Sequence, residues 1–168
     1  NMDAVTTVNV VTGIGHDSQG RQTASTTTSR RTGTDPATGR PLDVTTTTVR
    51  TGINYNPLGQ VTGYVDEMTS DADRVTTRNT VTLIRYDSLG RQIASTTTSR
   101  RTGTDPADGH ALDVTTTTVR TGINYNLLSQ VTAYADTVTS NFAERLTTTN
   151  TVTGITYDRY DRQTGSTT

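Results

Sequence analysis

The sequence predicts an all-β protein made of tandem antiparallel β-hairpins, with about ten strands in a meander or spiralling repeat sheet and little or no helix. Thr accounts for 43 of the 168 residues, and Thr is β-branched, which favours strands. Residues that favour helices are scarce, since Lys is absent and only two residues are Glu. The chain also repeats itself, which allows thin modules to share one core.

The repeat defines the expected organisation. Residues 16–60 match residues 86–130 at a shift of 70, with 37 identities in 45 positions. A partial third copy begins at Leu146. We therefore expect one repeat domain, 1–168, with units 5–74, 75–145 and 146–168, and with hairpins at 5–43, 44–74, 75–113 and 114–145 before the last one.

Each hairpin should have a first arm of Thr, Val and Ile that ends in Tyr, a tight turn, and a second arm. Strict alternation would place Val119, Thr121, Ile123 and Tyr125 on one face of a strand. The segments 29–43 and 99–113 carry Pro and Gly, so we expect them to be long loops outside the strands that fold back over one edge of the sheet.

The turns share a pattern of residue types. Asp or Asn opens a turn by bonding to its own backbone, and Gly three residues later supplies a positive φ. Tyr precedes the Asp or Asn in four of the five tips, and His16 takes its place in the first. The candidate turn residues are Tyr86, Asp87, Gly90 and Arg91, with Tyr55, Asn56, Gly59, Tyr125, Asn126, Tyr157 and Asp158.

The segment RYDSLGRQ (85–92) resembles the YD repeat, whose core is Tyr-Asp-x-x-Gly-Arg. That repeat builds Rhs proteins, wall-associated toxins of Gram-positive bacteria, the Tc-toxin cocoon and teneurins. The chain looks like a degenerate, Thr-rich variant. The resemblance implies a secreted or cell-surface structure of bacterial or archaeal origin without chemistry of its own. A fragment of a toxin-enclosing shell stays open as an alternative.

Composition excludes several classes of function. Without Cys there is no disulfide framework or thiolate zinc site. No apolar run is long enough to span a membrane, and a net charge of −1 gives no basic field for nucleic acid. His16 and His110 do not recur in register, and nearly all the acidic residues belong to turns, where Asp is expected. We expect no enzyme activity and no catalytic, metal-binding or cofactor-binding residue.

A ligand face is the main alternative to a purely structural function. Rows of Thr hydroxyls could bind ice or a glycan, and Arg side chains could bind an anionic glycan. The opposing interpretation is that Thr residues pair across strands, while the Arg side chains pair with nearby Asp. The candidate residues are Thr45, Thr47, Thr115, Thr117, Arg30 and Arg100.

Open sheet edges predict self-association. An exposed edge strand invites pairing with another chain, and the last hairpin begins another copy of the unit that opens at Val5. Head-to-tail addition of identical chains would make a filament. The chain begins with Asn1, so we expect it to be processed or taken from something longer. The leading hypothesis is a non-enzymatic extracellular fibre subunit or stalk segment whose partner is itself.

Overall fold

The computed structural model describes residues 5–35, 37–72, 74–105, 109–142 and 147–168. These residues form ten strands and no helix. The strands are β1 (Thr6–His16), β2 (Gln22–Thr34), β3 (Pro41–Tyr55), β4 (Val61–Ser70), β5 (Val75–Tyr86), β6 (Gln92–Thr104), β7 (Ala111–Tyr125), β8 (Val131–Ser140), β9 (Thr147–Tyr157) and β10 (Gln163–Thr167).

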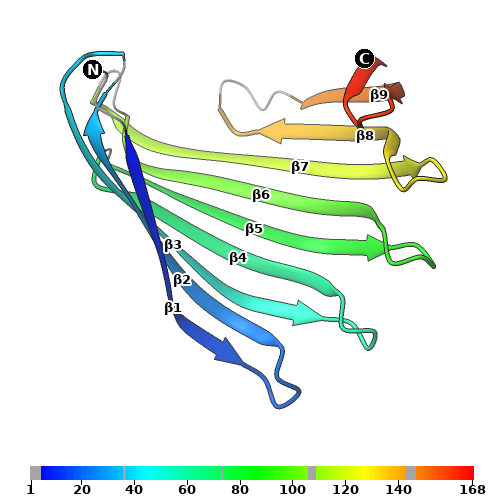
Figure 1. Ribbon diagram of the computed structural model, residues 1–168, viewed down its shortest axis with the longest axis horizontal. Helices are drawn as coiled ribbons and strands as arrows, with labels where there is room; N and C mark the ends of the chain where they lie inside the picture. The colour runs from blue at the N-terminus through cyan, green and yellow to red at the C-terminus, as the bar shows by residue number, and fades with distance from the viewer. Residues whose placement is uncertain (1–4, 36, 73, 106–108, 143–146) are drawn as a thin grey trace. The chain divides into compact units, whose positions relative to one another are not determined.

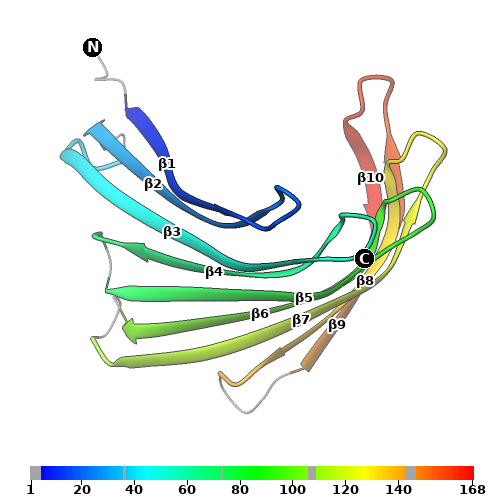
Figure 2. The same ribbon diagram turned by 90° about the horizontal axis from the view of Figure 1, so that it is seen from below.

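The strands form one antiparallel sheet in chain order, from β1 to β10 (Figures 1 and 2). Every strand pairs with its neighbours in the sequence, so the sheet is a meander without crossovers. In this order β1 and β10 each have a single neighbour. The predicted fold class, an all-β meander of hairpins, is confirmed.

The prediction of long loops at 29–43 and 99–113 is wrong. Strand β2 continues to Thr34 and β3 begins at Pro41, and the two pair in register from Ser25↔Arg50 to Thr34↔Pro41. Pro41 is tolerated because it is the first residue of its strand, where a missing N–H costs least. The second copy has the same arrangement in β6 and β7, and the prolines at 36 and 106 lie outside the described residues.

The sequence repeat is also a structural repeat. Strands β2, β3 and β4 have the same lengths as β6, β7 and β8, which are 13, 15 and 10 residues.

Two compact units can be distinguished by their internal contacts. The first comprises 1–54, 64–79 and 100–113, and the second comprises 55–63, 80–99 and 114–168.

A bulge interrupts the first arm of several hairpins. In β7 the pairing with β8 is regular up to Thr121 and resumes at Asn124, so Gly122 and Ile123 together oppose one residue of β8. Gly122 has a φ of 62°, the left-handed conformation that starts a glycine bulge. Bulges of the same kind lie at 13–14 in β1 and at 154–155 in β9.

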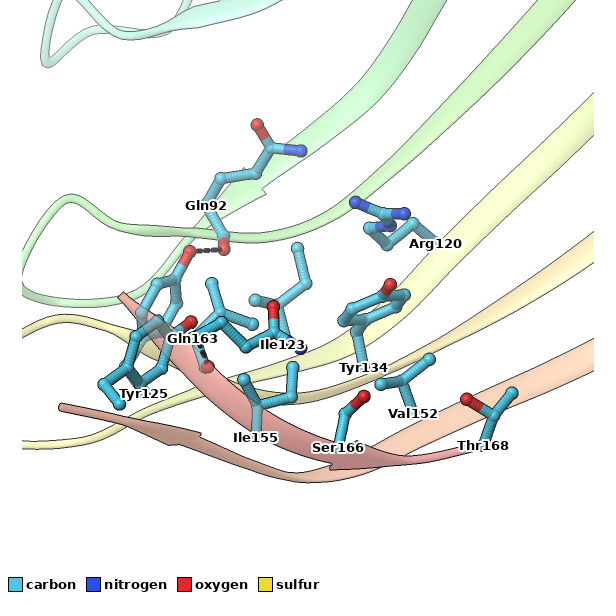
Figure 3. A pocket seen from close by; sticks show the side chains of 12 residues that line it. Gln92, Arg120, Ile123, Tyr125, Tyr134, Val152, Ile155, Gln163, Ser166 and Thr168 are labelled. Carbon is cyan, nitrogen blue, oxygen red and sulfur yellow. Dashed lines mark hydrogen bonds between the residues drawn. The ribbon is translucent and has the colours of Figure 1, made fainter. Parts of the chain in front are cut away.

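The bulge overturns the strict alternation predicted for β7. The extra residue moves Ile123 and Tyr125 to the face that carries Arg120, and these three side chains line one hollow (Figure 3). Val119 and Thr121 lie on the opposite face. Accordingly Ile123 is 8% exposed, whereas Val119 is 37% exposed.

The apolar core is thin in both units. In the described part of the first unit, the buried apolar residue is Val75. The described part of the second unit contributes Ile84, Ile123 and Ile155, each 8% exposed. Each of the three isoleucines directly follows a residue with a positive φ, which is Leu83, Gly122 or Gly154. Stability therefore depends heavily on backbone pairing and on polar contacts between strands.

Candidate functional site

The hairpin tips are the most regular polar feature of the chain. In the third tip, Asp87 Oδ1 accepts the backbone N–H groups of Leu89 and Arg91, both at 2.9 Å, and Oδ2 accepts Arg91 Nε at 2.8 Å. The backbone N–H of Gly90 donates to the carbonyl of Asp87 at 3.0 Å. One carboxylate therefore holds the whole turn, and the same bonds are made by Asp17 with Arg21 and by Asp158 with Arg162.

The second and fourth tips replace this ion pair with a neutral pair of the same shape. Asn126 Oδ1 accepts the backbone N–H groups of Leu128 and Gln130, and Asn126 Nδ2 donates to Gln130 Oε1 at 2.5 Å. A carboxylate can only accept, so it needs an Arg donor, whereas an amide also donates and needs an acceptor. Asn56 and Gln60 form the same pair at 2.7 Å.

The fourth turn position requires a left-handed backbone. Gly20, Gly59 and Gly90 have φ values of 76°, 78° and 79°, as glycine allows. Ser129 and Asp161 occupy the same position with φ values of 63° and 60°. The last two tips therefore hold non-glycine residues in a conformation that is strained for them.

The tip tyrosines bond each hairpin to the one before it. Tyr86 donates its hydroxyl to the carbonyl of Val61 at 2.7 Å, and Tyr125 donates to the carbonyl of Gln92 at 2.5 Å. Tyr157 donates to Val131 at 2.9 Å. In each case the acceptor is the first residue of the preceding hairpin's second strand. Tyr55 ends β3 at the equivalent position, and His16 ends β1.

Sequence reasoning missed two clusters of Arg, Tyr and Asp. Arg120 makes two bonds to Asp136, at 2.8 and 2.7 Å, and its guanidinium lies 4.2 Å from the centre of the Tyr134 ring. Arg50 makes the same contacts with Asp66 and Tyr64. The signal was available, because an Arg and an Asp recur 16 residues apart in both hairpins.

The candidate ligand arginines already have partners. Arg30 binds Asp43 with two bonds of 2.8 and 2.7 Å, and Arg100 binds Asp113 in the same way. Both pairs join adjacent strands at an exposed surface. A glycan anion would have to compete with these carboxylates.

The candidate threonines lie in β3 and β7 and are half-buried. Thr47 pairs with Thr28 across the β2–β3 ladder. Thr117 pairs with Thr139, and its hydroxyl lies 3.3 Å from that of Thr98. In the remaining candidates, the backbone N–H of Thr45 donates to Asp71 Oδ1 at 2.8 Å and that of Thr115 donates to Asn141 Oδ1 at 2.7 Å. The structure thus gives the Thr117 hydroxyl a Thr partner on the next strand, whereas Thr45 lies opposite Arg30.

The second unit contains a hollow of about 460 Å³. Ile123, Val131, Val152 and Ile155 form its apolar part, and Arg120, Gln92 and Gln163 contribute polar groups (Figure 3). The guanidinium of Arg120 is neutralised by Asp136. The rings of Tyr125, Tyr134 and Tyr157 complete the lining, together with Ser166 and Thr168.

The tip carboxylates are stabilised in their charged form. The backbone N–H of Arg91 lowers the pKa of Asp87, and the guanidinium of Arg91 lowers it further. The pKa of Asp17 is lowered for the same reasons, and that of Asp158 is lowered first by the Arg162 side chain. Partial burial raises the pKa of Tyr86 and of Tyr125, so both phenols remain hydrogen-bond donors at neutral pH.

In the part of the chain that the structure describes, no three His, Cys, Asp or Glu side chains gather to hold a metal ion. Within the same residues no helix is long and apolar enough to cross a membrane. No protein-family model, no curated protein and no solved structure matches the chain. The tip and cross-strand contacts described above can hold neighbouring hairpins against one another through repeated polar interactions.

Proposed function

We propose that this protein is a non-enzymatic, extracellular structural element whose hairpins assemble into a filament or a surface stalk. The observation that carries the proposal is the recurrence of one contact between hairpins. Three successive hairpins donate a tip tyrosine to the same carbonyl position of the hairpin before. An interface that is repeated within the chain can be repeated between chains.

The edges of the sheet support the same proposal. Among the described residues, β1 and β10 each have one neighbour, and a strand edge that is unpaired in the whole protein would be a template for pairing with another chain. Edges are commonly protected by lysine or by inward-pointing charges, and the chain contains no Lys. The first edge also exposes Val8, Val10 and Val11. Secretion or display at the cell surface follows from the resemblance of the tips to YD repeats.

Electron microscopy in negative stain over a range of concentrations tests this proposal, with sedimentation of the same samples as the quantitative measurement. Uniform unbranched filaments above a critical concentration are the expected result. Discrete particles of monomer mass at all concentrations would overturn it. Amorphous aggregates that do not redissolve on dilution would overturn it too, because specific assembly is reversible.

A Thr surface that binds ice or a glycan is the second candidate. Thr98, Thr117, Thr139 and Thr147 lie opposite one another on four neighbouring strands, from β6 to β9. The hydroxyls of Thr98 and Thr117 lie 3.3 Å apart, and those of Thr139 and Thr147 lie 3.4 Å apart. Thermal hysteresis of the unassembled protein, lost in Thr139→Val, would favour an ice-binding function. A glycan-array signal lost in the same variant would favour a carbohydrate.

A further inference from the structure

The tips of the last four hairpins carry large apolar side chains at their apexes. The third turn position holds Leu58, Leu89, Leu128 and Tyr160, which are 83%, 74%, 76% and 62% exposed, and Leu127 beside Leu128 is fully exposed. These five side chains, here named the tip row, all belong to the second unit. Exposed apolar residues are ordinary when they are scattered singly. Their return at one turn position in four consecutive hairpins is instead a regular feature of this surface.

The turns present these side chains while satisfying their own backbone. In all four tips the N–H of the third residue donates to the side-chain oxygen of the first, at distances between 2.8 and 3.0 Å. Each tip also lacks a net charge, since Asp87 is paired with Arg91 and the segments 56–60 and 126–130 contain no charged residue. A polar group that is already bonded costs little to remove from water. The tips can therefore enter a less polar medium.

The row is held in place by bonds between neighbouring tips. The tip tyrosines of the third, fourth and fifth hairpins each bond to the hairpin before, and Gln130 Nε2 donates to Asp161 Oδ1 at 2.7 Å. Successive tips are two strands apart, which is about 9.6 Å, and they follow one another along one end of the hairpins (Figure 1). A row fixed in advance loses little freedom on binding, so the weak contacts of its members combine.

The area of the row favours a lipid surface over a second copy of the chain. Full burial of a leucine corresponds to about 60–120 Å² of apolar surface, so five such side chains offer about 300–600 Å². A stable protein interface buries about 800 Å² on each partner. A rigid partner would also have to match separate side chains along a twisted row, whereas a fluid bilayer accepts each of them independently. Tyrosine and leucine are both common at the bilayer interface.

The fifth tip adds a cation suited to a phospholipid headgroup. Arg159 is exposed, and its guanidinium lies 4.6 Å from the centre of the Tyr160 ring. It pairs with no carboxylate among the residues that the structure describes, whereas Arg162 in the same tip is bonded to Asp158. A guanidinium binds phosphate oxygens with two parallel hydrogen bonds. An aromatic ring at the depth of the headgroups would place Arg159 beside their phosphates.

We propose that the tip row binds a phospholipid surface, with its leucines and Tyr160 in the interfacial region of the bilayer and Arg159 on a headgroup phosphate. This inference goes beyond the proposed function and does not depend on filament assembly. It requires only the tips of the second unit. Because the tips carry no net charge, binding needs no anionic lipid and is insensitive to salt.

Flotation with vesicles of phosphatidylcholine tests the proposal on the unassembled protein. Replacing Leu58, Leu89 and Leu128 with Gln should lower the partition coefficient by about ten-fold for each residue, and the triple variant should no longer float. The turn tolerates this change, because Gln19 occupies the same position in the first tip with the same backbone bond of 2.9 Å. The matched control is Phe142→Gln. Phe142 is 65% exposed and follows the far end of β8, so the control should float as the parent does.

The outcomes separate a lipid surface from other partners. Failure of the parent protein to float, or equal flotation of the parent and the triple variant, would overturn the proposal. Flotation that is lost at high salt would overturn it too, since that behaviour indicates adsorption by charge. A dimer that forms without lipid and is absent in the triple variant would assign the tip row to a second copy instead. Filament assembly would be untouched by any of these results.

A fluorescent label measures insertion directly, because the chain has no cysteine of its own. An environment-sensitive fluorophore on Leu89→Cys should shift its emission to the blue when vesicles are added, whereas the same label on Phe142→Cys should not. Equal shifts at both sites, or no shift at either, would contradict insertion of the tips.

The headgroup contact has its own pair of variants. Arg159→Gln should weaken flotation several-fold, because one charge-assisted bond to phosphate is lost. Arg78→Gln removes the same charge from another exposed arginine, in β5, and should leave flotation unchanged. Equal effects of the two substitutions would overturn the assignment of Arg159.

Discussion

Replacing Ser129 with glycine should stabilise the folded protein. Ser129 occupies the fourth turn position with a φ of 63°, where Gly90 has 79° in the preceding hairpin. The left-handed conformation costs an L-residue about 1–2 kcal/mol, and the greater freedom of glycine in the unfolded chain offsets about 0.5–1 kcal/mol of that gain. Because the Ser129 side chain is exposed, little packing is lost, and the net gain should be about 0.5–1 kcal/mol.

The reciprocal change in the third hairpin should have the opposite sign. Gly90→Ser should lose about 0.5–1 kcal/mol by the same reasoning, and Gly90→Val should lose more because β-branched residues adopt positive φ least readily. Steric overlap contributes little, since an added Cβ would lie 3.2 Å from Gln60 Nε2, the end of a flexible side chain. The double variant Gly90→Ser, Ser129→Gly should return close to the parent stability.

Urea denaturation and thermal unfolding by circular dichroism, performed below the critical concentration for assembly, measure these changes. For a chain of this length, 1 kcal/mol corresponds to about 2–4 °C in Tm. Gly90→Ser checks that the assay can detect a change at a tip. An unchanged or lower midpoint in Ser129→Gly, beside a clear loss in Gly90→Ser, would refute the conclusion that the fourth tip stores backbone strain.

Three further predictions concern single contacts. Tyr125→Phe should lower the free energy of unfolding by about 0.5–1.5 kcal/mol, which is the net contribution of its hydroxyl hydrogen bond. An unchanged denaturation midpoint would contradict a stabilising contact between the two hairpins. Gly103→Ala should destabilise by about 1–3 kcal/mol or more, because φ is 139° and the new Cβ would overlap the carbonyl oxygen of Arg74; parent-like unfolding would exclude that close approach. Acidification should loosen the third tip but not the fourth. The lowered pKa of Asp87 means that its bonds stabilise the tip above the ordinary value of 3.8 and are lost as pH falls through the lower folded value. Between about pH 5 and pH 2, hydrogen exchange of the amides in the Asp87 tip, corrected for intrinsic rates, should therefore become faster relative to exchange in the Asn126 tip. Parallel profiles for the two tips would contradict this prediction.

Local chemistry made the hairpins predictable. Alternation of Thr with Val and Ile, followed by Asp or Asn and then Gly, specifies a strand, a turn and a return strand within one short segment. The bonds at Asp87 and Asn126 join residues no more than four positions apart. Contacts of that range depend little on the rest of the molecule, so a single sequence was sufficient for them.

The predictions of long loops and of strict alternation in β7 were wrong for the same reason. The segments 29–43 and 99–113 looked like loops because proline and glycine are poor strand residues in isolation. Their flanks become strands because β2 and β3 pair with each other and bond Arg30 to Asp43. The bulge at Gly122 escaped prediction because it is a mismatch between two strands, and a one-strand pattern contains no information about its partner.

The sequence by itself determined the all-β class, the number of hairpins and the residues at each tip, because these depend on propensity, alternation and turn chemistry over a few neighbours. Tertiary structure alone decided which face Ile123 occupies, which carbonyl Tyr125 reaches and which arginines are already paired. Those outcomes depend on the register between strands that are distant in the chain. Register is set jointly by all the pairings of the sheet, and no single segment encodes it.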